Sequence, residues 1–363
     1  MSALLWIPYV LIAIWMCLWF VPYSVNGNRP LPECMALIPL LTFPTVLLMA
    51  CSAIAGQWWQ VGFAASQLAV QALWFVSTLV DIPRGALHIL GLPERRRRAA
   101  DAPMPAESSA SPRNLRWSLM TLNCRFGRAD ANDVVGQIQR RHVDVLALQE
   151  VTPELLQRLD DAGIGLELPY RSLGKASDDD NGGTNAILSR VKPAESSSSS
   201  IDILAADIPS LSLDIQGRRV RFVSAHPKSP GRGGRFWQIG IERLAGFSKR
   251  IISTHEAPSS HEPGGLPSYA PLPQETVVMG DLNSSLYHSV FRHLLTGSGL
   301  SDAAFEMKAG VHPSFPASWT YVPSMLEIDH ILMTEGLIPL SISTAIIAGS
   351  DHRALCSEIS MSA

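Results

Sequence analysis

The chain has 363 residues, which is enough for one large domain or two of ordinary size. It carries a net charge of −3, and the 22 basic and 27 acidic residues from residue 114 onward give that part −5. This charge argues against a surface that holds a nucleic-acid backbone, because such binding depends on neutralising phosphates. Apolar residues make up 47% of the chain, and the excess over what an enzyme core needs lies at the N-terminal end.

Two N-terminal stretches carry no charged residue, namely Ala3 to Tyr23 and Cys34 to Val80. Because a helix needs about 20 apolar residues to cross the hydrocarbon core of a bilayer, the pattern predicts an N-terminal bundle of about three transmembrane helices in residues 1–83. The expected spans lie near residues 3–23, 35–55 and 58–80. The first stretch lacks the basic start and small-residue cleavage site of a secretory signal, so we interpret it as retained and the chain as an integral membrane protein.

The third expected span is the least apolar of the three. Gln60, Gln67 and Gln71 occur along it. A partly buried helix is the alternative interpretation of this segment.

Residues 84–113 have the composition of a linker. Arg84 and the run Arg95 to Arg98 come first, followed by a stretch rich in Ala, Pro and Ser. Arginines this close to a span favour the cytoplasmic side of a membrane, and binding of anionic headgroups is their alternative use.

Two predicted strands in the following part end on polar side chains. Leu115 to Asn123 alternates and ends on a carboxamide, and the apolar run Val143 to Leu148 is followed by Gln149 and Glu150. A helix is predicted between them, over Asn132 to Arg141. Ligands gather at the carboxyl ends of strands in α/β sheets, so Asn123 and Glu150 are candidate site residues.

A predicted hairpin over 211–225 runs directly into His226. Lys228 and the glycine-rich loop with Arg232 and Arg235 follow it. Glycine backbone and arginine side chains both approach anionic oxygens closely, so the sequence favours phosphate contact by these residues.

The segment 277–285, VVMGDLNSS, places Asp281 and Asn283 on the turn after an apolar strand. Alternation puts the two side chains on one face, where they can converge on a single atom. The later strand 327–333, EIDHILM, carries Asp329 and His330, whose side chains point to opposite faces. Asp351 and His352 precede the last predicted strand.

Six short motifs, TLN, LQE, SAHP, GDLN, IDH and SDH, occur in this order between Leu115 and Ile359. In this they resemble the endonuclease/exonuclease/phosphatase family of metal-dependent phosphoesterases. The resemblance implies a four-layer α/β/β/α sandwich of two facing, largely antiparallel sheets in residues 114–363, with the site at one end. The expected fold class is therefore α/β, preceded by the transmembrane bundle.

The resemblance also implies roles for the site residues. Glu150 would be the main metal ligand, with Asn123 and Asp351 nearby, and hard oxygen ligands suit Mg²⁺ or Mn²⁺. Asp281 would orient or deprotonate the attacking water, and Asn283 would hold that water or the phosphoryl group. His226 and His352, the latter oriented by Asp329, would donate to the phosphoryl oxygens. His330 is assigned no catalytic role.

Together with the predicted spans, Trp237-Gln238 and Trp319-Thr320, the SAHP motif is similar to a narrower group, the bacterial membrane-anchored phosphatases associated with teicoplanin resistance. This implies a phosphatase at the bacterial cytoplasmic membrane that acts on a lipid (prenyl) pyrophosphate or phosphomonoester. The group places its catalytic domain outside the cytoplasm, whereas Arg95 to Arg98 favour the inside, so the side stays open. The alternatives are a phosphodiesterase of nuclease or sphingomyelinase type and a catalytically inactive membrane scaffold. Membrane lipid and a lipid-borne or small phosphate are the expected partners, nucleic acid is not, and no protein partner follows from the sequence.

Overall fold

Two six-stranded sheets form the centre of the protein, in a computed structural model that describes residues 6–80, 90–93, 116–175, 183–248, 274–319 and 321–362. The first sheet has the order β11 (Leu337–Ile346), β12 (Arg353–Met361), β1 (Trp117–Asn123), β2 (Val145–Val151), β4 (Thr184–Ser189), β3 (Tyr170–Leu173). The second has the order β5 (Glu195–Ser197), β6 (Ser210–Ile215), β7 (Arg218–Ser224), β8 (Gln274–Asp281), β10 (Asp329–Met333), β9 (Ser301–Asp302). The predicted 84–113 linker, apart from residues 90–93, lies outside the described residues.

Each sheet contains one parallel pair of strands among antiparallel neighbours. In the first sheet β1 runs parallel to β2, with Asn123 opposite Gln149. In the second sheet β7 runs parallel to β8, with Ser224 opposite Met279. Parallel pairing places the carboxyl ends of both strands at the same edge, which is what brings the predicted site residues of separate motifs into one region.

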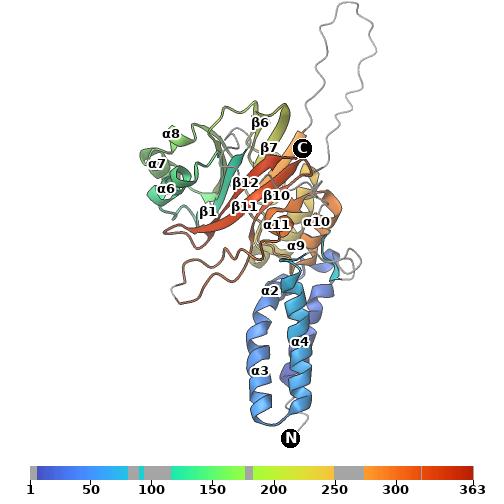
Figure 1. Ribbon diagram of the computed structural model, residues 1–363. Helices are drawn as coiled ribbons and strands as arrows, with labels where there is room; N and C mark the ends of the chain where they lie inside the picture. The colour runs from blue at the N-terminus through green and yellow to red at the C-terminus, as the bar shows by residue number, and fades with distance from the viewer. Residues whose placement is uncertain are drawn as a thin grey trace, which may run out of the picture.

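Helices cover the outer faces of both sheets, so that the fold has four layers (Figure 1). The helices α6 (Ala131–Arg141), α7 (Pro153–Asp161) and α8 (Ile164–Glu167) lie on the first sheet, and α9 (Pro230–Arg243), η6 (Leu244–Phe247) and α10 (Ser289–Ser298) lie on the second. The short helix α11 (Ala303–Met307) follows β9. Between the sheets, alternate strand residues such as Leu119, Phe222 and Met279 form a separate core.

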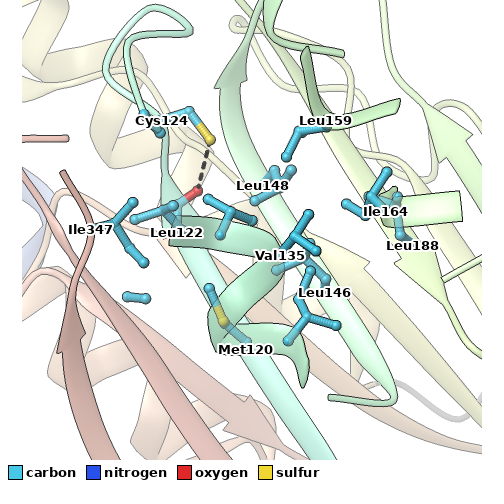
Figure 2. Packing of buried hydrophobic residues seen from close by; sticks show 14 of the residues in the cluster. Met120, Leu122, Cys124, Val135, Leu146, Leu148, Leu159, Ile164, Leu188 and Ile347 are labelled. Atoms are coloured by element: carbon cyan, nitrogen blue, oxygen red, sulfur yellow. Dashed lines mark hydrogen bonds between the residues drawn. The ribbon is translucent and has the colours of Figure 1, made fainter. Parts of the chain in front are cut away.

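The helix α6 illustrates why these segments fold locally. Asp130 caps its first turn by accepting the Asp133 N–H at 2.9 Å. Val134, Val135 and Ile138 recur at helical spacing and are all buried. Figure 2 shows Val135 packed among Met120, Leu122, Leu146 and Leu148 of the first sheet.

The predicted transmembrane bundle is wrong. Among residues 6–80 and the other described segments, no helix has both the length and the apolar character needed to cross a bilayer. The elements are α1 (Ile7–Met16), η2 (Cys17–Phe20), η3 (Tyr23–Val25), α2 (Leu31–Ala36), η4 (Ile38–Leu41), α3 (Thr42–Ile54) and α4 (Trp58–Val76). The expected location as an integral membrane protein is overturned with it.

The physical reason lies in the interruptions. The helix α1 has 10 residues and α3 has 13, which correspond to about 15 and 20 Å at 1.5 Å per residue. The 19-residue α4 is longer, but it carries the three glutamines, whose side chains are buried against the other helices. Gln67, for example, donates to the Tyr9 carbonyl at 2.8 Å.

The N-terminal helices extend from one end of the sandwich and are attached to it by polar contacts (Figure 1). The fully buried Asn26 donates to Ser289 Oγ at 2.8 Å and accepts the Val290 N–H at 2.9 Å, which caps α10 from outside the helix. His288 contacts the Pro32 carbonyl at 2.9 Å through Nε2, and the Gly27 N–H donates to Gln238 at 2.7 Å. The loop after β8 therefore faces the N-terminal helices.

Candidate active site

Sheet register brings the acidic residues of two motifs together. Asp281 is the last residue of β8, and the antiparallel pairing of β8 with β10 sets it directly opposite Asp329. On the other side of β8, Gly280 allows close packing against the end of β7, since a Cβ there would lie 1.9 Å from the Ala225 carbonyl oxygen. No other residue fits without moving β7, the strand that leads to His226.

Glu150 is held in an unusual backbone conformation at the end of β2. Its φ angle is 53°, in the left-handed region, and the register of β2 with β4 shifts between Leu148 and Val151. Gly183 packs against it so closely that a Cβ would lie 2.6 Å from Glu150 Cα. Strained backbone of this kind persists where the surroundings enforce it, and it occurs preferentially at functional sites.

Asp281 is the centre of the polar network. Its Oδ2 accepts from Asn123 Nδ2 at 3.0 Å, and its Oδ1 accepts the Asn283 N–H at 2.8 Å. His226 Nε2 lies 3.6 Å from Asp281 Oδ2 and 3.9 Å from Glu150 Oε1, so this imidazole stands between the two carboxylates. Asn283, also in a left-handed conformation with φ 48°, donates its side-chain amide to the Pro227 carbonyl at 3.2 Å.

A buried His–Asp pair completes the network. His352 Nδ1 lies 2.7 Å from Asp329 Oδ2, and His352 Nε2 lies 3.6 Å from Asp281 Oδ2. Burial disfavours the imidazolium, but the charges of Asp329 and Asp281 outweigh it and raise the pKa of His352 to about 10. This ring therefore carries a positive charge at neutral pH and has an N–H to donate through Nε2.

The pKa of the Asp281 carboxyl is raised, chiefly because burial removes the carboxylate from water. The positive charge on His352 acts in the opposite direction, and Asp329 adds to the rise. A carboxylate with a raised pKa accepts a proton more readily than an ordinary aspartate, as a general base requires.

Two places in the network offer carboxylate oxygens to a divalent cation, the group around Asp281 and the side chain of Glu150. Ligand atoms of Asp281, Asp329 and His352 all lie within 4.8 Å of one another, but His352 and Asp329 already bond to each other, so we regard these two as a charge pair. Asp329 Oδ1 is buried with no hydrogen-bond partner among the described residues. Glu150 accepts the Phe126 N–H at 2.9 Å through Oε2 and keeps Oε1 beyond bonding distance of His226, so it retains a carboxylate oxygen for a hard metal ion.

Asp351 lies at the edge of the network. It is half-buried, and its Oδ2 is 3.6 Å from Arg125 Nε. Its neighbour Ser350 links two of the motifs, since Ser350 Oγ donates to the Asn123 carbonyl at 2.7 Å and accepts the His352 N–H at 2.9 Å. The sequence offered a signal for Ser350, because it stands first in the SDH motif.

The three basic residues predicted to contact substrate are arranged differently from one another. The predicted glycine-rich loop is part of α9, which begins at Pro230 and is interrupted at Gly233. Lys228 is buried, with Nζ 5.4 Å from the Phe236 ring centroid. The Arg232 guanidinium lies 5.8 Å from the ring centroid of Phe126, whose N–H holds Glu150, whereas the exposed Arg235 lies beside Gly27 and away from this network.

The turn that carries Asn283 is fixed from behind by residues to which the sequence assigned no site role. His330, on the face of β10 opposite to Asp329, lies 2.8 Å from Asp302 Oδ2 through Nδ1 and 2.8 Å from the Ser284 carbonyl through Nε2. Trp237 Nε1 donates to Ser284 Oγ at 3.1 Å. Asp302 had no signal in the sequence, because it lies outside every motif.

The profile of the Endonuclease/Exonuclease/phosphatase family matches residues 120–352, which contain every residue of the network. The chain belongs to this family. Its members are phosphoesterases that use divalent metals, in agreement with the geometry around Glu150 and Asp281. No sequence among the curated proteins matches the chain.

Two of the solved structures that are similar to this chain come from D. rerio and Beutenbergia cavernae. TDP2 of D. rerio, in complex with a single-strand DNA product, aligns over 68% of this chain and 99% of its own with 15% identity and a TM-score of 0.51. The endonuclease/exonuclease/phosphatase from Beutenbergia cavernae aligns over 68% of this chain and 72% of its own, with 15% identity and a TM-score of 0.49. The similarity to TDP2 shows a common fold.

Proposed function

We propose that this chain is a divalent-metal-dependent phosphatase that acts on a lipid (prenyl) pyrophosphate or phosphomonoester. The observation that supports it most directly is the network in which Asn123, His226 and His352 surround Asp281, beside Glu150. In this network a base, two imidazole donors and a metal-binding carboxylate lie within a few ångströms of one another.

The residues would divide the reaction among them. Asp281, oriented by Asn123 and the Asn283 N–H, accepts the proton of the attacking water. The side chain of Asn283 holds that water or the phosphoryl group. The positively charged His352, fixed by Asp329, and His226 donate to the non-bridging oxygens as negative charge develops on them.

The metal-binding residues would be Glu150, with Asn123 and Asp351 nearby, and their oxygen atoms favour Mg²⁺ or Mn²⁺. A bound divalent cation supplies charge stabilisation for the leaving oxygen. Lys228 and Arg232 would contribute positive charge on the side of α9, and Arg235, which is exposed on the same helix, would meet only a larger substrate.

The test is release of inorganic phosphate from farnesyl pyrophosphate with and without Mg²⁺. Glu150→Gln and Asp281→Asn should each lower the rate by at least ~10²-fold while the protein stays folded. The exposed Glu335, at the end of β10 remote from Asp329, provides the control Glu335→Gln, which should keep the wild-type rate. Activity that persists in both site variants would reject the assignment.

A phosphodiesterase is the second candidate, because TDP2 of D. rerio shares the fold and was determined with a DNA product. The net charge of −5 from residue 114 onward counts against a nucleic-acid substrate. Product analysis decides between the two. Cleaved single-stranded DNA or phosphocholine from sphingomyelin would favour the diesterase, and free phosphate from the prenyl pyrophosphate would favour the phosphatase.

A further inference from the structure

A cavity of about 90 Å³ lies where the N-terminal helices meet the sandwich. Trp19 and Trp74 contribute from the N-terminal helices, and Tyr287 and Ile328 contribute from the sandwich. The two indoles stack with their ring centroids 4.5 Å apart, and Tyr287 stands edge-on to Trp19 at 5.5 Å. Neither half of the molecule forms this cavity alone.

The cavity and the proposed active site share a wall. Ile328, which lines the cavity, directly precedes Asp329, and consecutive Cα atoms are about 3.8 Å apart. The Leu282 N–H donates to the Ile328 carbonyl at 2.8 Å, which ties this wall to the turn between Asp281 and Asn283. The cavity therefore lies beside the turn that carries Asp281 and Asn283.

The lining selects an apolar occupant. Most of the described lining side chains are aliphatic or aromatic, and Glu327 is the only charged one among them. The lining offers no positive charge to a phosphate group, so it favours a hydrocarbon over a phosphate. Apolar cavities of about 150 Å³ bind benzene, so this volume admits a segment of about three or four carbon atoms.

A second observation points to a ligand. The indole N–H of Trp74 is buried and has no hydrogen-bond partner among the described residues. Leaving such a buried donor unpaired is unfavourable. An acceptor atom on the occupant, such as an ether or hydroxyl oxygen, would satisfy it.

We propose that this cavity binds the apolar part of the phosphate substrate, with the phosphate directed toward Asp281. The inference rests on the proposed phosphatase function and assigns it a substrate class, namely phosphate esters of amphiphilic alcohols. It also gives the N-terminal helices a role, because Trp19 and Trp74 complete the site.

The test uses n-alkyl phosphates from methyl to decyl with the full-length protein. KM should fall by up to ~4-fold for each methylene that enters the cavity and should level off after about four, since ~0.8 kcal/mol is gained for each buried methylene. Ala36, which lines the cavity at the end of α2, can be enlarged to fill it. Ala36→Phe should abolish the gain with chain length and leave KM for methyl phosphate unchanged.

The matched control is Ala53→Phe, at an exposed position on α3, which should retain the chain-length dependence. Val311, which lines the same cavity from the sandwich, gives a second filling variant, and Val311→Trp should reproduce Ala36→Phe. Identical chain-length profiles for Ala36→Phe and Ala53→Phe would overturn the inference.

A binding measurement separates failure of this inference from failure of the proposed function. Bromodecanol carries no phosphate and should quench the tryptophan fluorescence of the wild type and of Ala53→Phe but not that of Ala36→Phe. Quenching without phosphate release from any ester would support the cavity and reject the phosphatase. Equal quenching in all three proteins would reject the cavity.

Discussion

Two buried His–Asp pairs lie close together in the fold, and each histidine is held by one aspartate, Asp329 or Asp302. Asp329 holds His352 at 2.7 Å inside the proposed active site, and Asp302 holds His330 at 2.8 Å behind it. In both pairs the negative charge of the aspartate raises the pKa of the histidine, which favours its positively charged form. Only the first pair has an imidazole N–H facing Asp281.

Asp329→Asn should therefore reduce kcat for phosphate release by ~10²-fold, because the neutral amide neither fixes nor charges His352 as the carboxylate does. The same change should lower the pKa of His352, which an NMR titration of the imidazole reports. Asp302→Asn is the matched control and should reduce stability with a smaller loss of kcat. Equal losses of kcat in the two variants would contradict the assigned role of His352.

Gly280 lies where the structure has no space for a side chain. Gly280→Ala places a Cβ 1.9 Å from the Ala225 carbonyl oxygen and should lower the free energy of unfolding by about 3 kcal/mol. Gly217, at the β6–β7 turn, also has a positive φ but has open space around it, so Gly217→Ala should lose only about 1 kcal/mol. Urea unfolding of both variants checks this difference, and equal losses would show that backbone strain alone is responsible.

The strand β10 connects the proposed active site to the residues that support it from behind. Alternation sends Asp329 to the face of the catalytic network and His330 to the opposite face, toward Asp302 and Ser284. Burial disfavours the charged form of His330, but Asp302 and Glu327 outweigh it and raise the pKa of His330 to about 9.

This pKa predicts how stability depends on pH. The folded state binds the His330 proton more tightly than the unfolded state, so the stabilisation is complete below the ordinary pKa of about 6.5 and is lost as the pH rises to about 9. The contribution is about 3 kcal/mol. The difference in unfolding free energy between wild type and His330→Gln should shrink from pH 6.5 to pH 9.5 in urea titrations, and a difference independent of pH would contradict it.

The elements of the sandwich that could be predicted from the sequence were those with clear periodicity. The helix predicted over 132–141 is α6, and the apolar strand before Glu150 is β2. The strand β11 was missed, because Pro339 and the irregular register beside it obscure the alternation. The glycine-rich start of α9 was predicted as a loop, because nothing local shows that Gly233 interrupts a helix there.

The site could be predicted in part for a related reason. The motif residues lie at the ends of strands or in the adjoining turns. The register of β8 with β10 sets Asp281 opposite Asp329, and the facing of the two sheets brings Asn123 to Asp281. Partners that depend on tertiary contact could not be predicted. No local pattern in the sequence indicates that Asp302 contacts His330, 28 positions later, or that Gly183 packs on Glu150.

At the scale of the whole molecule, the first eighty residues show that apolar composition alone does not define a membrane span. Turns and short 3₁₀ helices divide the stretches without charge, and the glutamines of α4 make hydrogen bonds within the helical region. Trp19 and Trp74 pack against Tyr287 of the sandwich. The N-terminal helices are thus joined to the domain that carries the proposed active site.

Substitution of Asn26 tests this contact between the N-terminal helices and the sandwich. Its side chain caps α10 through Val290 and bonds Ser289, so Asn26→Ala removes both bonds at a buried position and should lower the free energy of unfolding by about 1–3 kcal/mol. The Val290 amide should exchange its hydrogen faster, because it loses its acceptor. Asn132→Ala, at an exposed position of α6, is the control and should change neither.

The same variant tests whether the attachment of the N-terminal helices affects substrate binding or the catalytic step. If the helices serve to complete the cavity beside the site, loosening them at Asn26 should raise KM for decyl phosphate several-fold while kcat/KM for methyl phosphate stays constant, since the catalytic network contains no residue of the N-terminal helices. A parallel loss for both substrates would show instead that the helices support the geometry around Asp281, which lies only a short loop away from Ser289.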